Sequence, residues 1–351
     1  MEKEEGGIAI QGVKLLAEAG ISQLPPKFIR PPHERNSIAQ CSPHHIPLLD
    51  LTHLHGHNRH LLLEQLHTAC KQWGFFRVIN HGVSARICDR MMEVVNQFFD
   101  LPIEEKMVYY EGNILKKGTR YGVSFNAETD EVLEWRDSLR HFCCPLPEVV
   151  ETWPDKPAAY REIAVEYATS VRHLAEQLLA ALSECLELKA DRLLRSLGTF
   201  IQTLLMNYYP PCPNPELALG LTAHSDISAL TVLLQDETTG LQVSQDGLWV
   251  DVEPVPNSFI VNVGDVLQVL SNDTYQSVQH RAITNSEKAR VSIVMYCAPS
   301  LDTQIFPFKE LVDNDHPPLF RGFTYADYRT SFYSKRREGK QPLESMRIVA
   351  V

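Results

Sequence analysis

The chain has 351 residues, of which 44% are hydrophobic and 22% are charged. This length allows one large domain or two ordinary ones, and the composition allows a sizeable buried core. Its 33 Lys and Arg residues are outnumbered by 44 Asp and Glu residues, which gives a formal net charge of -11. Because nucleic acids and anionic membranes attract basic surfaces, we expect neither of them as a partner.

The N-terminus and the cysteines favour a cytoplasmic location. Residues 1–5 are mostly acidic and do not lead into an apolar stretch, so they resemble neither a secretory signal nor a transit peptide. No apolar run approaches the roughly 20 residues that span a bilayer. The eight cysteines are scattered, and we expect them to be reduced. The adjacent Cys143 and Cys144 are interpreted as small hydrophobic residues.

The first half of the chain mixes helical and extended patterns. Apolar residues at helical spacing predict helices over residues 12–19, 58–73, 84–99 and 157–188. The last of these is the longest, and its single apolar face predicts that it supports a sheet. Strands are predicted at residues 46–51, 75–80 and 134–143. The Pro-rich residues 24–32 are predicted to be extended and to wrap over the main body, although binding of a partner is an alternative.

Several polar groups in this half suggest chemistry but are better explained by structure. Seven histidines crowd residues 44–67 without a carboxylate or cysteine at ligand spacing, so we do not expect them to bind a metal. His81 is interpreted as a hydrogen-bonded histidine at the end of a strand. The charged residues 134–137 could include acid or base catalysts, but a salt-bridged structural segment is the preferred interpretation.

From residue 200 the pattern becomes rich in short strands. They are predicted at residues 202–209, 229–235, 240–244, 248–252, 258–263, 266–270, 277–283 and 290–297. Turn residues every six to twelve positions indicate antiparallel strands in a sandwich or barrel. A final helix is predicted at residues 325–333. We therefore divide the chain into an N-terminal mixed helical region at 1–199, a β core at 200–300 and a C-terminal helical segment at 301–351, which is a candidate lid.

The core contains a candidate metal site made by His224, Asp226 and His280. Residues two apart on an extended segment point to the same side, so His224 and Asp226 can reach one ion together. His280 would arrive from a distant strand. Two imidazoles and one carboxylate suit a non-haem Fe(II) with open coordination positions. A structural zinc site would instead close with four ligands.

A candidate carboxylate-binding group lies close to these ligands in the sequence. Arg290 and Ser292 share one face of a predicted strand, and a guanidinium with a hydroxyl can hold a carboxylate. Tyr209 could add a phenolic hydrogen bond. Taken alone, Arg290 would be explained as a surface ion pair with Glu287 or Glu253, but its proximity to the triad favours a role in the site.

The motifs resemble those of the plant-type 2-oxoglutarate-dependent dioxygenases. They are residues 207–213 (Asn-Tyr-Tyr-Pro-Pro-Cys-Pro), 224–226 (His-Ser-Asp), 280–281 (His-Arg) and 290–292 (Arg-Val-Ser). Residues 73–76 and 80–83 are similar to the N-terminal signature of that family. The resemblance covers nearly the whole chain. It implies a mainly β fold with flanking α elements: a double-stranded β-helix (jelly-roll) core, wrapped by N-terminal helices and a long supporting helix.

The resemblance also implies roles for these residues. The triad would bind Fe(II), and Arg290 with Ser292 would hold the distal carboxylate of 2-oxoglutarate, helped by Tyr209 and Asn207. With O2, the co-substrate would be converted to succinate and CO2 while the substrate is hydroxylated or desaturated. Ascorbate is the expected reductant. We expect a monomer whose partner is a small aromatic molecule.

The resemblance is strongest to enzymes that act on flavonoids, hydroxycinnamoyl thioesters and coumarins. Candidate substrate-contacting residues are Phe125, Phe142, Leu205, Tyr296, Ala298 and Phe306. Tyr296 could stack on a planar ring, although it could equally be a core residue. Leu205 and Ala298 replace a lysine and a glutamate of anthocyanidin synthase-like members. This change disfavours leucoanthocyanidin and favours a more apolar pocket.

Three alternatives remain open from the sequence. A same-fold Fe(II) oxidase that does not consume 2-oxoglutarate would retain the same Arg-x-Ser motif. A hormone or other small-molecule oxygenase outside phenylpropanoid metabolism would share the reaction but not the substrate. A non-enzymatic binding protein on the same scaffold is disfavoured, because it has no physical need for an intact ligand set.

Overall fold

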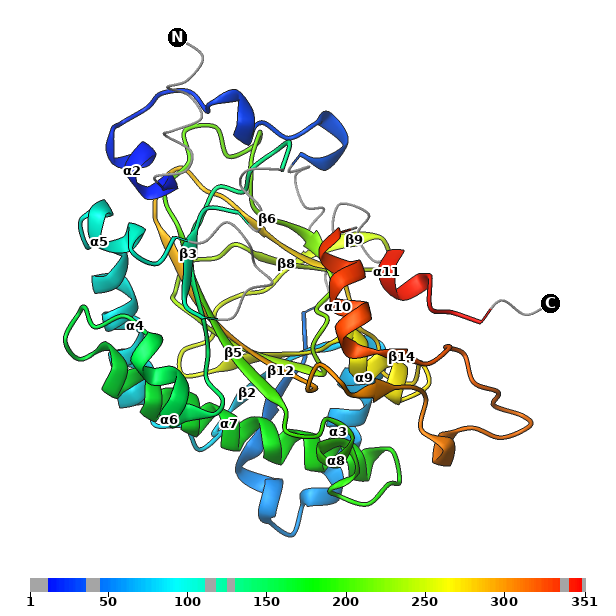
Figure 1. Ribbon diagram of the computed structural model, residues 1–351. Helices are drawn as coiled ribbons and strands as arrows, with labels where there is room; N and C mark the ends of the chain where they lie inside the picture. Colours follow the sequence, from blue (N-terminus) through cyan, green and yellow to red (C-terminus); the bar gives the residue numbers. More distant parts are fainter. Residues whose placement is uncertain (1–11, 36–44, 111–117, 125–129, 335–340, 349–351) are drawn as a thin grey trace.

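The computed structural model describes residues 12–35, 45–110, 118–124, 130–334 and 341–348. Within these ranges, eight strands form the larger of two facing sheets (Figure 1). In spatial order they are β1 (Leu48–Asp50), β2 (Phe75–Ile79), β10 (Phe259–Val263), β7 (Leu230–Gln235), β12 (Arg290–Ala298), β5 (Ile201–Tyr209), β4 (Asp137–Phe142) and β3 (Arg120–Gly122). All neighbours are antiparallel except β1 and β2.

The smaller sheet contains, in order, β6 (Leu219–His224), β11 (His280–Ile283), β8 (Leu241–Gln245) and β9 (Leu248–Asp251). One narrow cavity is lined by residues of both sheets, which shows that the sheets face each other across a common interior. This arrangement confirms the predicted mainly β jelly-roll core. The larger sheet includes four strands that precede residue 200, so the N-terminal half contributes directly to the core sheet.

Alternation along the central strands separates the site from the packing core. On β5, Leu205, Asn207 and Tyr209 line the cavities between the sheets. The residues that alternate with them, such as Leu204 and Met206, belong to the main hydrophobic cluster on the other face of the sheet. This two-residue period is a direct consequence of strand geometry. It gives the sheet one chemically active face and one face that packs against helices.

Helices cover the outer face of the larger sheet (Figure 1). The longest, α7 (Tyr160–Cys185), packs against α3 (Arg59–Gln72), α4 (Ala85–Phe99) and α8 (Arg192–Ser196), and it also contacts β7 and β12. Its buried face confirms the supporting role predicted for it. None of the helices in the described part of the chain has the length and apolar character needed to cross a membrane.

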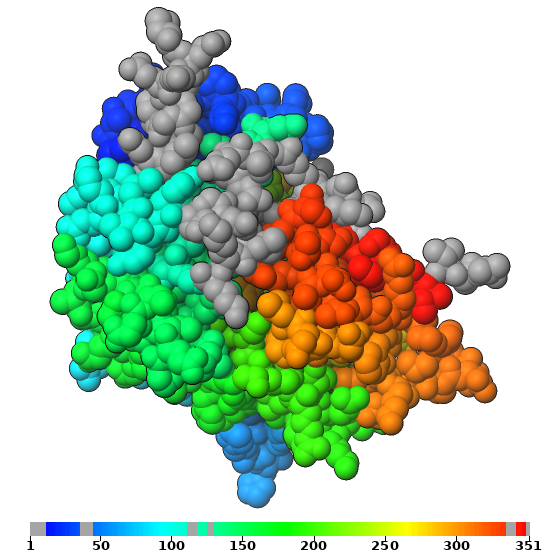
Figure 2. All heavy atoms as spheres, in the orientation of Figure 1, coloured from blue at the N-terminus to red at the C-terminus, as the bar shows by residue number. Residues whose placement is uncertain are grey.

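The ends of the chain cover other parts of the core. The short helices α2 (Val13–Glu18) and α5 (Ile103–Met107) lie near one edge, and α10 (Tyr325–Ser334) and α11 (Gln341–Glu344) lie on the opposite flank, as Figures 1 and 2 show. The Pro-rich segment wraps over the body as predicted, with the Phe28 ring 5.1 Å from the Trp135 ring. It does so through two 3-10 turns, Pro26–Phe28 and Pro32–Glu34, rather than as an extended run.

Other details of the predicted secondary structure are also wrong. Residues 266–270 belong to a helix, α9 (Asp265–Leu270), in which every residue is buried. A short, mostly apolar run has a similar pattern in a buried strand and in a buried helix, so periodicity could not separate them. Strand β6 is absent from the predicted strands; it contains Gly220 and Ala223, two residue types that are depleted in strands.

Gly74 sets the position of the segment that leads to His280. Its φ is +61°, and a Cβ atom there would lie 2.0 Å from the backbone oxygen of Gln276. We expect Gly74→Ala to lower the free energy of unfolding by about 2–4 kcal/mol, because it combines left-handed strain with a backbone clash. Gly82→Ala is the matched control, since Gly82 has φ +79° and open space around it. Equal losses for both variants in denaturant titrations would contradict the steric explanation.

Candidate active site

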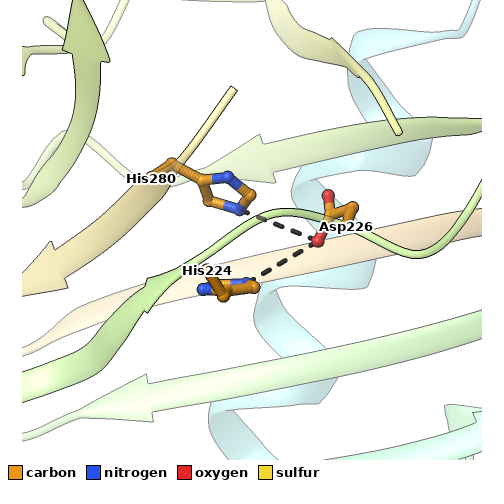
Figure 3. Close-up of side chains that lie close together, drawn as sticks. All are labelled: His224, Asp226 and His280. Atoms are coloured by element: carbon orange, nitrogen blue, oxygen red, sulfur yellow. Dashed lines mark ion pairs between the residues drawn. The ribbon is translucent and has the colours of Figure 1, made fainter. Parts of the chain in front are cut away.

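The candidate metal ligands meet where the two sheets come together. His224 is the last residue of β6 and pairs directly with His280, the first residue of β11. Asp226 lies two residues beyond the end of β6. Its Oδ1 atom is 3.6 Å from His224 Nε2 and 3.8 Å from His280 Nε2, and Figure 3 shows the three side chains converging. All three are buried, and their ligand atoms lie within 4.8 Å of one another.

Backbone carbonyls orient both imidazoles. The Nδ1 atom of His224 is 2.8 Å from the carbonyl oxygen of Thr222, and that of His280 is 3.3 Å from the carbonyl oxygen of Val278. A carbonyl can only accept, so each Nδ1 carries the proton and each Nε2 keeps its lone pair for a metal. The Phe75 ring packs edge-on against His280 at 5.1 Å. The donor set therefore fits a divalent transition metal held by three ligands on one side.

The opposite sheet holds the carboxylate of Asp226. Its Oδ2 atom accepts hydrogen bonds from Thr231 Oγ1 at 2.7 Å and from Asn262 Nδ2 at 2.8 Å. Thr231 lies on β7 and Asn262 on β10, where both are buried among apolar neighbours. These bonds direct Oδ1 toward the histidines. Neither residue was predicted from the sequence, although a polar side chain in a largely apolar strand was a usable signal.

Helix α9 fixes the loop that carries Asp226. The amide of Asp265 donates to the carbonyl oxygen of Asp226 at 2.7 Å. The Asp265 carboxylate accepts from Ser225 Oγ at 3.2 Å and from the Tyr328 hydroxyl at 2.7 Å. Tyr328 belongs to α10, so the C-terminal helix is tied to the loop between two metal ligands. This explains why a helix rather than a strand is needed directly after β10.

The predicted carboxylate-binding residues form a second group beside the triad. Arg290 is 2% exposed and stands opposite Tyr209 across the β12–β5 pair, while Ser292 stands opposite Asn207. Both pairs line the same narrow cavity as the triad. Burial excludes the surface ion pair that would otherwise explain Arg290. A Cβ atom on Gly220 would lie 2.5 Å from the Tyr209 ring, so this glycine makes the room that the phenol needs.

Arg290 retains hydrogen-bonding capacity toward the cavity. Its Nη2 donates to Gln235 Oε1 at 2.7 Å, and its guanidinium carbon lies 5.2 Å from the centre of the Tyr209 ring. Its Nε is buried and has no hydrogen-bond partner among the described residues. A buried donor without a partner is costly, and an incoming carboxylate would satisfy it. The group therefore fits a dicarboxylic co-substrate.

A buried ion pair connects the two groups. Arg136 Nη2 lies 2.8 Å from Glu134 Oε2, which confirms the structural interpretation of this segment. Glu134 Oε1 also accepts from the Thr222 hydroxyl at 3.0 Å, while Arg136 Nη1 donates to Asn207 Oδ1. Asn207 in turn donates to Ser292 Oγ at 3.2 Å. Burial alone would lower the pKa of Arg136, but the Glu134 carboxylate raises it above the ordinary value.

A larger cavity of about 510 Å³ opens beside the triad. Its wall includes four of the predicted substrate-contacting residues: Phe142, Leu205, Tyr296 and Ala298. Helix α10 contributes Tyr325, Arg329, Phe332 and Tyr333, so the predicted C-terminal lid segment forms part of this wall. The volume lies within the range of small-molecule pockets.

Of the other two predicted substrate residues, one is described by the structure. Phe306 is 50% exposed and lies outside the cavity wall, so its assignment is corrected. Its neighbour Ile305, in β13 (Gln304–Ile305), takes the buried position, and successive residues of an extended segment point to opposite sides. Phe125 lies outside the described residues.

His81 and the two adjacent cysteines have structural surroundings. Within the described ranges, His224, Asp226 and His280 form a group of side chains that could hold one metal ion. His81 contacts the carbonyl oxygen of Asn257 at 3.2 Å and the Phe259 ring at 4.6 Å, as expected for a strand-end histidine. Cys143 and Cys144 are free thiols, and burial raises the pKa of Cys143.

The contact between Thr231 and Asp226 can be tested by metal binding. We expect Thr231→Val to weaken Fe(II) or Co(II) affinity roughly 10- to 100-fold, because the ligand carboxylate loses a hydrogen bond that aims it. Thr231→Ser keeps the hydroxyl and should retain most of the affinity. Anaerobic calorimetry measures both. Metal binding by the valine variant at wild-type affinity would show that Asn262 alone positions the carboxylate.

Comparison with known proteins agrees with this geometry. Residues 200–299 match the model of the 2OG-Fe(II) oxygenase superfamily, and residues 46–161 match the N-terminal model described as non-haem dioxygenase in morphine synthesis. The chain is 44% identical to Protein DMR6-LIKE OXYGENASE 1 of Arabidopsis thaliana, over 89% of this chain and 90% of the relative. It is 40% identical to Flavanone 3-dioxygenase 2 of Oryza sativa subsp. japonica, over 97% and 98%.

A solved structure shares the whole architecture. The crystal structure of JOX2 in complex with 2OG, Fe and JA superimposes with a TM-score of 0.87 at 36% sequence identity, covering 96% of this chain and 97% of that one. Family models, relatives and structure agree with the buried His-Asp-His group. The chain therefore belongs to the plant 2-oxoglutarate- and Fe(II)-dependent oxygenases, and it is a dioxygenase that uses iron and 2-oxoglutarate.

Proposed function

We propose that this dioxygenase hydroxylates or desaturates a small aromatic plant metabolite of the flavonoid or phenylpropanoid class, releasing succinate and CO2. One observation carries the proposal: a buried three-ligand group lies between a carboxylate-binding group and a largely apolar cavity. This is the order that the reaction needs, because the co-substrate and the substrate must approach the same metal from different sides.

In this proposal His224, Asp226 and His280 hold the iron. When bound, Fe(II) supplies the activation of O2 that the protein's own side chains cannot supply, and it leaves the protein to position and shield the reactants. The backbone carbonyls behind both histidines and the Thr231–Asn262 pair behind Asp226 keep the three ligands pointing inward. The three ligands are each less than 9% exposed, which limits the access of bulk water to an ion held by them.

Arg290 and Ser292 hold the distal carboxylate of 2-oxoglutarate, with Tyr209 and Asn207 beside them. The buried Nε of Arg290 supports this assignment, since this donor has no acceptor among the described residues. The Arg136–Asn207 bond holds the amide that donates to Ser292. The serine hydroxyl accepts this bond and keeps its own O–H free to donate to the carboxylate.

The substrate occupies the larger cavity in this proposal. Phe142, Leu205 and Ala298 offer apolar contacts, and the Tyr296 ring faces the same space. The relative that acts on a flavanone supports an aromatic substrate. The JOX2 structure supports a second candidate, a non-phenylpropanoid small molecule, because JA binds within the same fold. The cavity has a volume of about 510 Å³, so a hydroxycinnamoyl thioester would have to leave most of its thiol portion outside it.

Coupled turnover tests the proposed reaction. Protein supplied with Fe(II), 2-oxoglutarate and ascorbate, and screened against flavanones, hydroxycinnamates and coumarins, is expected to release one succinate for each substrate oxidised. His224→Ala should abolish both products because the metal loses a ligand, whereas His55→Ala, in the histidine-rich segment, should leave both unchanged. Substrate oxidation without 2-oxoglutarate would instead identify an oxidase, and failure to bind Fe(II) would refute an enzymatic role.

The co-substrate assignment is tested separately. We expect Arg290→Gln to weaken 2-oxoglutarate binding by about 2–5 kcal/mol, since a buried charge-assisted contact is lost. Arg290→Lys keeps the charge without the planar fork and should give an intermediate loss. Calorimetric titration of 2-oxoglutarate into the Fe(II)-loaded protein under nitrogen measures the change. Unchanged affinity in both variants would remove Arg290 from the binding site.

A further inference from the structure

Helix α10 lines the larger cavity with one face and reaches the metal-ligand loop with another. Four of its residues share the first face and lie in the cavity wall: Tyr325, Arg329, Phe332 and Tyr333. Tyr328 does not belong to this wall. Its side chain is fully buried, and its ring stacks on that of Phe323 with 4.8 Å between the ring centres. Tyr328 therefore belongs to the face of the helix that packs into the protein.

Tyr328 donates a hydrogen bond to helix α9. Its hydroxyl lies 2.7 Å from Asp265 Oδ2, and the same oxygen accepts a hydrogen bond from Ser225 Oγ at 3.2 Å. Burial and the neighbouring carboxylate raise the pKa of Tyr328 well above its ordinary value, so the phenol keeps its proton and remains a donor. One carboxylate thus joins helix α10 to the residue that stands between His224 and Asp226.

The beginning of α9 is also bonded to the loop after β6 along its backbone. The amide of Asp265 donates to the carbonyl oxygen of Asp226 at 2.7 Å. The preceding amide, that of Gly264, donates to the carbonyl oxygen of Ala229 at 3.0 Å. A Cβ atom on Gly264 would overlap the carbonyl oxygen of Ser228, so the two backbones are in direct contact. A displacement of α9 therefore moves the loop with it.

Asp226 is thus held at two separate points. Thr231 and Asn262 hold its carboxylate from the larger sheet. Asp265 holds its backbone, and Asp265 is held in turn by Tyr328. The first contact sets the direction of the ligand oxygen, whereas the second sets the position of the loop that carries it. The second contact depends on helix α10.

We propose that Tyr328 and Asp265 are positioning residues that couple helix α10 to the metal ligand Asp226. Docking of α10 against α9 holds the loop in place for the metal, and by thermodynamic reciprocity a bound metal stabilises the docked helix. A molecule in the larger cavity acts through the same coupling, because its contacts with Tyr325 or Phe332 also stabilise the docked helix. This inference rests on the proposed function, which assigns the triad to iron and the cavity to the substrate.

Metal affinity tests the first half of the coupling. Tyr328→Phe removes one hydroxyl and keeps the ring. We expect it to weaken Co(II) binding roughly 10-fold, as the loss of other hydrogen bonds behind a metal ligand does. The affinity is measured calorimetrically with Co(II) alone, which binds without turnover. Unchanged affinity in this variant overturns the proposal.

Tyr160→Phe is the matched control for metal binding. The Tyr160 hydroxyl lies 2.8 Å from His141 Nε2, and both side chains are fully buried where α7 packs against β4. This variant loses a buried hydrogen bond of similar length on the face of the sheet that packs against helices. We expect its Co(II) affinity to equal that of the wild type. An equal loss in Tyr160→Phe and Tyr328→Phe would reflect general destabilisation and would overturn the proposal.

Hydrogen exchange tests the reciprocal half of the coupling. Amide exchange in residues 325–334 is measured by mass spectrometry with and without Co(II). In the wild type we expect the metal to slow exchange in α10 roughly 10-fold, because linkage acts equally in both directions. In Tyr328→Phe this metal-dependent difference should vanish. A merely structural tyrosine would speed exchange equally with and without metal, so a difference that survives in the variant, or is absent from the wild type, overturns the proposal.

Asp265→Asn tests whether the two residues act through one contact. The asparagine oxygen still accepts from Tyr328 and Ser225, but a neutral acceptor binds the two hydroxyls less strongly than a carboxylate. We expect a smaller loss of Co(II) affinity than in Tyr328→Phe. The double variant should lose less than the product of the two single losses, since both changes affect one hydrogen bond. Losses that multiply in full would show separate actions and would overturn the coupling through Asp265.

Failure of this inference is distinguishable from failure of the proposed function. Wild-type protein that binds Co(II) and 2-oxoglutarate, and oxidises an aromatic substrate with Fe(II), without a metal-dependent change in α10 would preserve the proposed function and overturn the coupling. Co(II) binding by His224→Ala at wild-type affinity would instead overturn the assignment of the metal ligands, and the coupling with it.

Discussion

The rest of the site depends on two hydrogen bonds from the larger sheet to one carboxylate. Asp226 belongs to the loop after β6, yet its Oδ2 atom is held by Thr231 and Asn262 from the opposite sheet. Both histidines come from the smaller sheet. The triad therefore exists only while the two sheets keep their spacing, and helix α9 adds a backbone hydrogen bond that prevents the loop from withdrawing. A jelly roll suits this purpose because its two sheets are stiff and face each other.

Much of the site could be predicted from the sequence because its chemistry is local. The His-x-Asp spacing, the distant His280 and the Arg-x-Ser pair are read from residue type and strand alternation, and the structure brings all of them to one interior. The residues that support them were harder to find. Thr231 and Asn262 act through contacts between strands far apart in the chain, and one sequence without register information does not show which polar residue faces which ligand.

The parts of the fold that the sequence predicted poorly lie next to the site. Strand β6 contains Gly220, whose lack of a side chain leaves space for Tyr209 and also lowers β-propensity. Helix α9 is mostly apolar and is buried throughout, so its pattern carries no clear periodic signal. In both places tertiary contacts decide the local structure. The contacts that build the site thus account for the sequence features that made strand β6 and helix α9 hard to predict.

The Glu134–Arg136 pair connects the proposed iron site with the proposed co-substrate site. On one side Glu134 holds Thr222, whose carbonyl orients His224; on the other, Arg136 holds Asn207, which orients Ser292. A continuous chain of buried polar contacts therefore links the metal-ligand group to the carboxylate-binding group, so that a shift in one can displace the other. Thermodynamic linkage then requires reciprocity: to whatever extent iron strengthens the binding of 2-oxoglutarate, 2-oxoglutarate strengthens the binding of iron by the same factor. How well the protein retains the metal between turnovers then depends on the concentration of 2-oxoglutarate as well as on the three ligands.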